Sequence, residues 1–419
     1  MSSRRAVASV LLPFAAGYYL SYLFRTINAL SSAALEADLH LGAAGLGLLT
    51  SAYFLTFAAA QLPIGVALDR FGPRRVQLVL LPIAGGGAAL FAAAEGFGAL
   101  MLGRALIGLG AAASLMAGLK ALVLWFPKER LALANSCYVM LGALGAVTAT
   151  APAEMLLEAL GWRGLFVALA AATVAAAAAL WLIAPRDPDV PTPGAGVRPG
   201  LRVVFRNRHF WRVAPLSACC TGSAFALQGL WAGSWLADVA MLDRVAVVHG
   251  LLAMALGLCA GALSLGIAAD RLRRRGVLPG DLLAAVAAAV MLAQLALALR
   301  LLPLPPAPLW AFLGAVGSAT VLGYAALTKA FPKEMAGRAN AALNLLHIGA
   351  AFLIQAGIGF VVGRWAADAG GHYPAAAYAA AFCANLVPQA LALGWFLLAP
   401  RLAAGTAMPS SSFPQGQSQ

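Results

Sequence analysis

The chain has 419 residues, of which 62% are hydrophobic and only 10% are charged. Soluble domains average about 45–50% apolar and about 25% charged residues, so this composition excludes a large soluble enzyme. The formal net charge is +13, but the basic residues lie in short segments between apolar runs. They do not form the basic patches with interleaved aromatic residues that are typical of nucleic-acid binding. We therefore expect a membrane-embedded protein without a nucleic-acid partner.

Apolar runs long enough to cross a bilayer recur along the whole chain. A helix needs about 20 apolar residues to span the hydrocarbon core. Twelve such runs are predicted, at residues 10–32, 45–67, 77–96, 99–125, 132–156, 164–184, 210–236, 248–268, 281–301, 309–330, 340–362 and 376–399.

The longest polar gap divides these spans into six and six. It covers residues 185–209 and is rich in proline and glycine. We therefore expect an N-terminal six-helix bundle (1–184), a cytoplasmic linker (185–209) and a C-terminal six-helix bundle (210–400). The polar tail 401–419 is expected to be disordered and cytoplasmic.

The distribution of basic residues predicts the orientation. If the N-terminus lies in the cytoplasm, most of the 28 basic residues fall on the cytoplasmic side, and only Arg163, Arg244, Arg300 and Arg364 fall on the outer side. This bias follows the positive-inside rule. It predicts a multi-pass protein of a bacterial-type inner (plasma) membrane with both termini in the cytoplasm.

Two loop landmarks recur at nearly one offset and indicate an internal repeat. The segment Gly65–Arg70 follows the second span, and the related Gly266–Arg271 follows the eighth, 201 residues later. Phe126–Glu129 follows the fourth span, and the identical Phe331–Glu334 follows the tenth, 205 residues later. The chain is therefore predicted to be a duplicated six-helix unit.

The first of these loops carries a family resemblance. The pattern Gly65-x-x-x-Asp69-Arg70-x-Gly72-x-Arg74-Arg75 resembles the loop signature of the major facilitator superfamily, and Arg104-x-x-x-Gly108-x-Gly110 is similar to its second signature. The resemblance covers the whole chain. It implies two pseudo-symmetric six-helix bundles, transport by alternating access and usually a monomer, without a cofactor.

Two departures from the family pattern qualify this resemblance. The second loop copy, with Asp270 and Arg271, has Arg273 in place of the second glycine. The family's antiporter signature ends in Gly-Pro-x-x-Gly-Gly, whereas the fifth span here reads Ala-Pro-Ala-Glu at 151–154. This departure makes drug–proton antiport less expected.

The loop signature suggests a gate on the cytoplasmic side. Gly65 is expected to let two helices approach closely, and Gly72 to permit a tight turn. Asp69 is placed to cap the positive N-terminus of a helix. The resemblance names that helix as the eleventh span near residues 336–340, and pseudo-symmetry pairs Asp270 with residues 131–135. The alternative is that these charges only set the topology.

Polar residues within the spans are the candidate substrate ligands, because exposing them to lipid is costly. Arg25 shares one helix face with Tyr18 and Tyr22. A buried guanidinium flanked by tyrosines can hold a carboxylate through two hydrogen bonds. The alternative is that Arg25 reaches the outer headgroups or pairs with a neighbouring helix.

The fourth span contains two further cations. Arg104 and Lys120 are 16 residues apart, so they point about 160° apart around a helix and do not face one cavity together. The resemblance implies helix packing and coupling for Arg104. Lys120 is a candidate anion ligand, with extension to the nearby cytoplasmic surface as the alternative.

The second half offers neutral candidates. Gln228, Trp231 and Trp235 are expected to share one face of the seventh span. Asn340, Asn344, His347 and Gln355 are expected to share one face of the eleventh span. Gln228, Trp231, Asn344 and His347 are the candidate wall residues, with interhelical hydrogen bonding as the alternative. The ordinary pKa of histidine would also suit proton coupling at His347.

The spans hold no deep Asp or Glu to neutralise these cations. We therefore expect a carrier for a small organic or inorganic anion, with proton symport as an option. The alternatives are a proton-coupled drug or metabolite exporter, a carrier of a zwitterion such as a dipeptide, and a non-transporting receptor. No enzyme motif is present, and the five cysteines form no CxxC pair, so no metal site is expected.

Overall fold

The computed structural model describes residues 7–187, 201–301, 305–317, 320–328, 331 and 333–399. These residues form helices joined by turns and contain no strand. Eleven helices in this part of the chain are long and apolar enough to cross a membrane, and the shorter apolar stretch Cys137–Thr148 lies where the fifth span was predicted. The all-α fold predicted from the hydropathy is confirmed.

The elements of the first half follow one another with short connections. They are η1 (Val7–Leu11), α2 (Leu12–Thr26), α3 (Asn28–Leu39), α4 (Ala43–Phe71), α5 (Pro73–Ala92), α6 (Phe97–Ala111), α7 (Ser114–Trp125), α8 (Lys128–Thr148) and α9 (Ala151–Ile183). The elements η1 and η2 are π-helical turns.

The second half repeats this pattern after a short helix in the predicted linker. Its elements are α10 (Leu201–Arg206), α11 (Arg208–Ala226), η2 (Leu227–Trp231), α12 (Ala232–Asp238), α13 (Arg244–Arg274), α14 (Pro279–Leu299), α15 (Pro306–Gly317), α16 (Thr320–Thr328), α17 (Lys333–Val362) and α18 (Ala375–Leu398). Residues 188–200 of the predicted linker and the tail 401–419 lie outside the described residues.

Several spans are interrupted rather than continuous. The first consists of η1, α2 and the start of α3, the fourth of α6 and α7, and the seventh of α11, η2 and α12. In α9 the backbone leaves helical geometry at Gly161, where φ is 67°. Glycine adopts this conformation without a steric penalty, and the break separates the predicted fifth and sixth spans.

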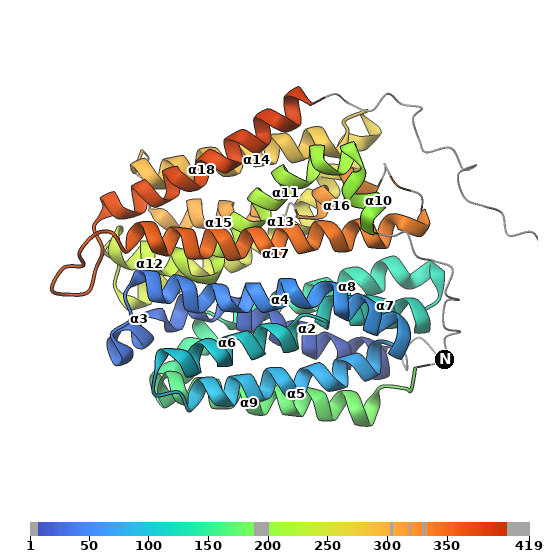
Figure 1. The fold of residues 1–419 in the computed structure, drawn as a ribbon, viewed down its shortest axis with the longest axis horizontal. Helices are drawn as coiled ribbons and strands as arrows, with labels where there is room; N and C mark the ends of the chain where they lie inside the picture. Colours follow the sequence, from blue (N-terminus) through green and yellow to red (C-terminus); the bar gives the residue numbers. More distant parts are fainter. Residues whose placement is uncertain are drawn as a thin grey trace, which may run out of the picture.

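The helices form two layers, with α2–α9 below and α11–α18 above in the view of Figure 1. At the contact between the layers α4 and α17 run side by side (Figure 1). A Cβ atom added to Gly47 of α4 would lie 3.0 Å from the Cα of Gly359 in α17. Small residues therefore allow these two backbones to approach closely.

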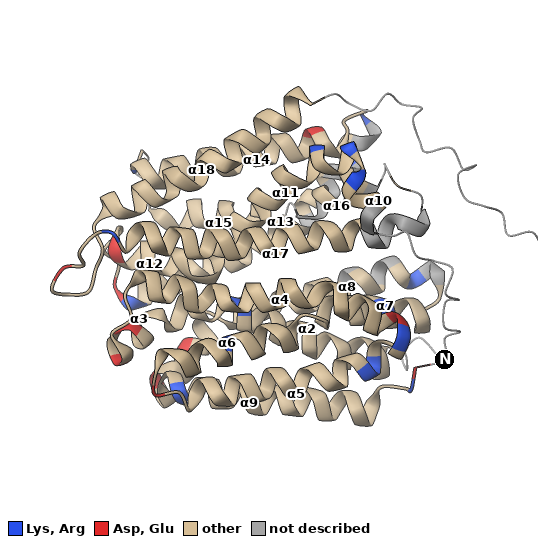
Figure 2. Ribbon diagram, viewed as in Figure 1, with Lys and Arg blue, Asp and Glu red and all other residues tan. Residues whose placement is uncertain are grey.

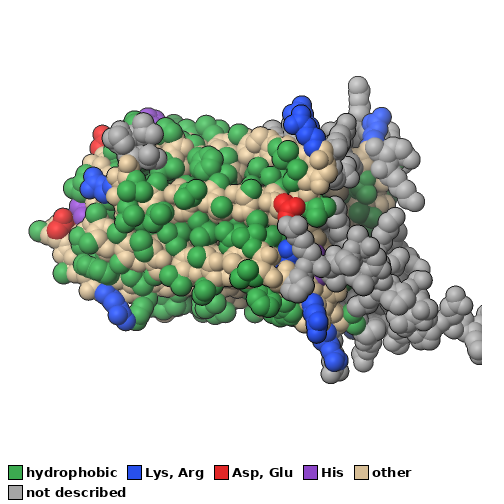
Figure 3. All heavy atoms as spheres, turned by 90° about the horizontal axis from the view of Figure 1, so that it is seen from above, with side chains coloured by type: hydrophobic (Ala, Val, Ile, Leu, Met, Phe, Trp, Pro, Cys, Tyr) green, Lys and Arg blue, Asp and Glu red, His purple; other side chains and the backbone are tan. Residues whose placement is uncertain are grey.

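Charged residues gather at the two ends of the bundle, and the stretch between them contains few of them (Figure 2). Hydrophobic side chains cover the lateral surface between these ends (Figure 3). Outward-facing residues in this band include Val79, which is 64% exposed, and Leu391, which is 70% exposed. Such an apolar band fits the hydrocarbon core of a bilayer.

The two ends are named by their predicted orientation. The end that carries the turn at Gly72 between α4 and α5 is the predicted cytoplasmic side. The end that carries α3 and α12 is the predicted outer side.

Candidate functional site

Arg25 in α2 lies at the contact between the two layers of helices. Its side chain is buried, with a residue exposure of 9%. The guanidinium carbon lies 3.8 Å from the ring centre of Tyr22 and 4.3 Å from that of Phe225 in α11. The two aromatic rings come from different halves, so the cation sits where the halves meet.

Two of the three guanidinium nitrogens of Arg25, Nε and Nη2, make no hydrogen bond within the described residues. Contacts with aromatic faces stabilise a cation by about 0.5–2 kcal/mol each, whereas an uncompensated buried charge costs several kcal/mol. An anion bound to the free edge of the guanidinium would offset that cost through charge-assisted hydrogen bonds.

Tyr18 lies beside Tyr22, with a ring-centroid distance of 5.3 Å. Its ring stacks on Tyr138 of α8, with a centroid distance of 5.2 Å. A Cβ atom added to Gly142 would lie 2.2 Å from the Tyr18 ring, so the ring fills the space left by that glycine. Contact of Tyr18 with substrate stays a prediction. Tyr18 contributes to packing between α2 and α8.

Arg104 in α6 acts on the backbone beside Arg25. Its Nη1 donates a hydrogen bond to the carbonyl oxygen of Phe24 at 3.1 Å, and the residue is fully buried. The ring of Tyr53 lies 5.6 Å from its guanidinium carbon. This hydrogen bond fixes the turn of α2 that presents Arg25, consistent with the packing role implied for Arg104.

A polar cluster from the second half lies nearer the predicted cytoplasmic side. The Nδ2 atom of Asn344 in α17 donates to Oε1 of Gln61 in α4 at 3.0 Å, and its Oδ1 accepts from the hydroxyl of Tyr324 at 3.0 Å. His347 is fully buried, and its Nε2 is 2.8 Å from Oγ of Ser217. Asn344 and His347 thus lie on one face of α17, as predicted.

Gln61 and Tyr324 were missed by the sequence reasoning. Both are polar residues within predicted spans, which is the signal that could have identified them. Their contacts with Asn344 show that α4, α16 and α17 meet at this level of the bundle.

The seventh span does not present the single face that was predicted. Gln228 borders a small cavity lined by residues such as Thr26 and Met254. The Nε1 atom of Trp231 donates a hydrogen bond to the backbone carbonyl oxygen of Gln355 in α17 at 3.2 Å. Trp235 packs on Trp310 of α15, with a distance of 5.7 Å between the ring centres.

The π-helical turn η2 explains this difference. It covers Leu227–Trp231 and adds a residue to one turn. The spacing that would align Gln228, Trp231 and Trp235 in a regular α-helix therefore fails here. Trp231 closes the α4–α17 contact, and Trp235 belongs to the core of the second half.

The two halves are held together on the predicted outer side by an ion pair. Arg244 at the start of α13 donates from Nε and Nη2 to the two carboxylate oxygens of Glu154 in α9, both at 2.5 Å. Its Nη2 also donates to the Leu30 carbonyl in α3 at 2.9 Å. One side chain from the second half thus binds two helices of the first.

A second set of polar residues surrounds a cavity of about 680 Å³ at the same end. Asp238 accepts hydrogen bonds from the Tyr378 hydroxyl at 2.6 Å and lies 2.9 Å from Nδ1 of His372. Glu36 of α3, beyond the first span, lines the same cavity. Burial, and then the negative charge of Asp238, raise the pKa of Glu36 to about 7.

The hydrogen bonds and ion pairs between the halves described above lie at the outer end and in the middle of the bundle. Of these, the one between Gln61 and Asn344 lies nearest the predicted cytoplasmic side. Those at the outer end hold the two halves together there in this structure. No group of three or more His, Cys, Asp or Glu suited to a metal ion occurs within the described residues.

Comparison with known proteins identifies the family. The model of the Major Facilitator Superfamily matches residues 14–354. The chain belongs to the Major Facilitator Superfamily. It is accordingly a multi-pass membrane protein of a transporter family.

Two curated relatives of different kinds match part of the chain. A probable sulfoacetate transporter of Cupriavidus necator is 26% identical over 157 residues, which is 38% of this chain and 36% of that protein. The tetracenomycin C resistance and export protein of Streptomyces glaucescens is 32% identical over 162 residues, 37% of this chain and 29% of that protein. The matched stretch thus spans about a third of each relative.

A solved structure matches nearly the whole chain. It is a bacterial homologue of the human lysosomal transporter Spinster, in an inward-facing and unoccupied conformation. The TM-score is 0.76 with 19% identity, over 95% of this chain and 97% of that one. At this identity the likeness establishes the superfamily fold alone.

The superfamily loop signature forms the turn between α4 and α5. Gly72 has φ of 80°, so the predicted tight turn is present. The backbone nitrogen of Arg74 donates to Asp187 at 3.0 Å, and its guanidinium donates to carbonyl oxygens at the end of α9. Asp187 thus caps α5, while Arg74 caps α9.

Other residues of the signature differ from the predictions. A Cβ atom at Gly65 would meet nothing within 4 Å, so no helix approaches closely there. Gly108 instead provides the close contact, because a Cβ atom there would lie 2.3 Å from the Tyr53 carbonyl oxygen. Arg70 stacks on Phe71 at 5.2 Å. The side chain of Asp270 lies outside the described residues, and Arg271 is exposed.

Asp69 and Lys120 bind each other, a pairing that the sequence analysis did not include. The Nζ atom of Lys120 lies 2.6 Å from Oδ1 of Asp69 and 2.8 Å from the Leu68 carbonyl oxygen. Lys120 therefore has a carboxylate partner at the predicted cytoplasmic end and does not join Arg25. Asp69 is thus engaged within its own half by the amine of α7.

Proposed function

We propose that this transporter carries a small anion by alternating access and binds its negative group at Arg25. The observation that carries the proposal is the buried guanidinium with unpaired nitrogens at the contact between the halves. Among the described residues no carboxylate forms an ion pair with it. The sulfoacetate named for one relative is a small anion, which is the class of substrate proposed here.

The neighbouring residues have separate roles in this proposal. Tyr22 and Phe225 hold the guanidinium plane, and Asn344 supplies a polar wall from the second half. His347 is the candidate for proton coupling, since its ring contacts Ser217 and lies 5.4 Å from Tyr324. A zwitterion such as a dipeptide would bind its carboxylate in the same way.

A proton-coupled exporter is the second candidate. The observation that favours it is the name of the Streptomyces glaucescens relative. The sequence argues against it, because the fifth span lacks the ending of the antiporter signature.

We further propose that the chain functions as a monomer in a bacterial-type inner membrane, with both termini in the cytoplasm.

A ligand screen on the purified protein tests the anion proposal. Sulfoacetate, nitrate and small carboxylates are compared with choline in a thermal-shift assay. A ligand at 100 times its Kd stabilises the folded state by about 2.7 kcal/mol. We expect stabilisation by one class of anion and its loss in Arg25→Gln.

Arg364→Gln is the matched control. Arg364 also stacks on an aromatic ring, with Phe360 at 4.7 Å, but it is exposed at the predicted outer side. This variant should keep the anion response. Stabilisation by choline alone, or an equal response in Arg25→Gln and the control, would contradict the proposal.

A further inference from the structure

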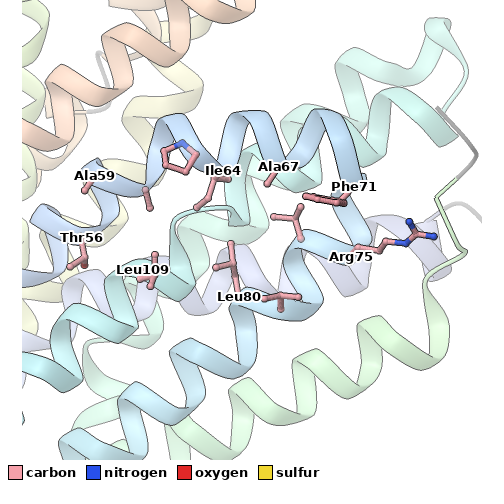
Figure 4. Close-up of a pocket in the computed structure, with 12 residues that line it drawn as sticks. Thr56, Ala59, Ile64, Ala67, Phe71, Arg75, Leu80 and Leu109 are labelled. Atoms are coloured by element: carbon pink, nitrogen blue, oxygen red, sulfur yellow. The ribbon is translucent and has the colours of Figure 1, made fainter. Parts of the chain in front are cut away.

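A second cavity lies away from the contact between the halves, on the lateral surface of the first half. It has a volume of about 780 Å³ and is bounded by α4, α5 and one residue of α6. Figure 4 shows its residues arranged in a row between the two long helices. We call this cavity the α4–α5 groove.

The walls of the groove are almost entirely apolar. Small side chains of α4, such as Ala60 and Ala67, leave the space, and Leu80 of α5 forms the opposite wall. The groove opens toward the surroundings, since Phe71 and Val79 on its border are 47% and 64% exposed. In a membrane protein this lateral surface faces acyl chains.

The groove is long enough to cross one leaflet of a bilayer. Its α4 residues run from Thr56 to Phe71, which is about 22 Å along a helix axis. Half of the hydrocarbon core is about 15 Å thick. An acyl chain that enters from the predicted cytoplasmic surface would therefore lie along the groove for its full depth in the leaflet.

One end of the groove is cationic. Arg75 lines it and is exposed, and Figure 4 shows its guanidinium directed away from the apolar side chains. Arg70 stacks on Phe71, which also lines the groove. Neither guanidinium forms an ion pair within the described residues, and Asp187 is bound to the backbone of this turn instead.

We propose that the α4–α5 groove binds an anionic phospholipid, with one acyl chain in the groove and the phosphate held by Arg70 and Arg75. The lipid is favoured over another occupant because the walls are apolar, the opening faces the bilayer, and both cations lie at the headgroup end. Basic residues near a membrane surface favour anionic lipids in this way. The bound lipid would brace the turn that joins α4 to α5.

Native mass spectrometry of the purified protein with added lipid tests this proposal. The probes are phosphatidylglycerol and phosphatidylcholine with identical acyl chains, with inorganic phosphate as a third arm. We expect preferential retention of phosphatidylglycerol and no response to phosphate. A preference for free phosphate, or equal binding of both lipids, would overturn the proposal.

Two variants separate the headgroup contact from the groove. Arg75→Gln should weaken phosphatidylglycerol binding about fivefold, and the double variant with Arg70→Gln about thirtyfold. Ala67→Phe should fill the groove and displace both lipids.

Each variant has a matched control on another surface. Arg364→Gln removes an exposed arginine from the predicted outer side, and Ala390→Phe adds a ring to the exposed face of α18. Both should keep lipid binding unchanged. If Ala67→Phe binds as much lipid as Ala390→Phe, or Arg75→Gln as much as Arg364→Gln, the groove is not the site.

Discussion

Breaking the ion pair between Arg244 and Glu154 should open the predicted outer side. The pair is bidentate, and it also engages the Leu30 carbonyl. The Arg244 side chain is 37% exposed and that of Glu154 is 10% exposed. Loss of one partner costs about 3–5 kcal/mol in a buried pair, and an exposed pair contributes about 0–1 kcal/mol.

The burial of this pair is intermediate between the two cases. We therefore expect Arg244→Gln to lower the stability of the contact between the halves by roughly 1–3 kcal/mol. The ratio of outer-closed to outer-open molecules should fall roughly 5- to 150-fold. Ala29 is a suitable reporter because it is 4% exposed and contacts Gly233 of the other half. A cysteine placed there, in a protein lacking its five native cysteines, should react faster with a maleimide after the substitution.

The control breaks an ion pair at the same end that lies within one half. Arg163 binds Asp38, and both residues belong to the first half. Arg163→Gln should leave the labelling rate unchanged, and exchanging the charges of Arg244 and Glu154 should restore slow labelling. If Arg244→Gln labels no faster than Arg163→Gln, the ion pair does not close the outer side.

Three further predictions follow from individual contacts. Glu36 has a pKa raised from 4.5 to about 7 in the closed form, so its stabilisation of that form is fully present below about 4.5 and lost as the pH rises through about 7. The labelling assay should show this pH dependence in wild type and not in Glu36→Gln. Lys120→Met should leave anion affinity within about twofold, because Lys120 binds the exposed carboxylate of Asp69. A large loss of affinity would restore Lys120 to the substrate site. Gly108→Val should lower thermal stability by about 1–3 kcal/mol, because the added atoms overlap the α4 backbone. Unchanged stability, measured against Gly65→Val at an open position, would contradict that packing.

The spans and the repeat could be predicted from the sequence because lipid imposes strong constraints. A chain in hydrocarbon must satisfy its backbone within each helix, so long apolar runs define the elements. The turn at Gly72 was predictable for a similar local reason, since its positive φ favours glycine.

The contacts between distant helices could not be predicted. Arg244 and Glu154 each resemble an ordinary charge near a span end, and only the fold brings them together. Lys120 and Asp69 belong to one half, and nothing in their spacing along the sequence shows that their side chains form an ion pair. Gln61 was overlooked because its partner, Asn344, lies in the other half.

Helix faces were predictable only where the helix is regular. Asn344 and His347 lie in the continuous helix α17, and their shared face follows from the helical period. Trp231 and Trp235 flank the end of η2 and point to different neighbours. A π-helical turn has no clear sequence signal here, so the loss of alignment could not be anticipated.

The position of Arg25 connects binding to the movement of the halves. The outer contacts extend from Arg244 inward to Phe225, and Phe225 covers the Arg25 guanidinium from the second half. Any motion that separates the halves on the outer side also removes this ring from the cation. A substrate anion at Arg25 would therefore bind at the inner limit of the closed region, where it compensates the charge in the closed form. The affinity for the anion and the population of the closed form should accordingly rise together.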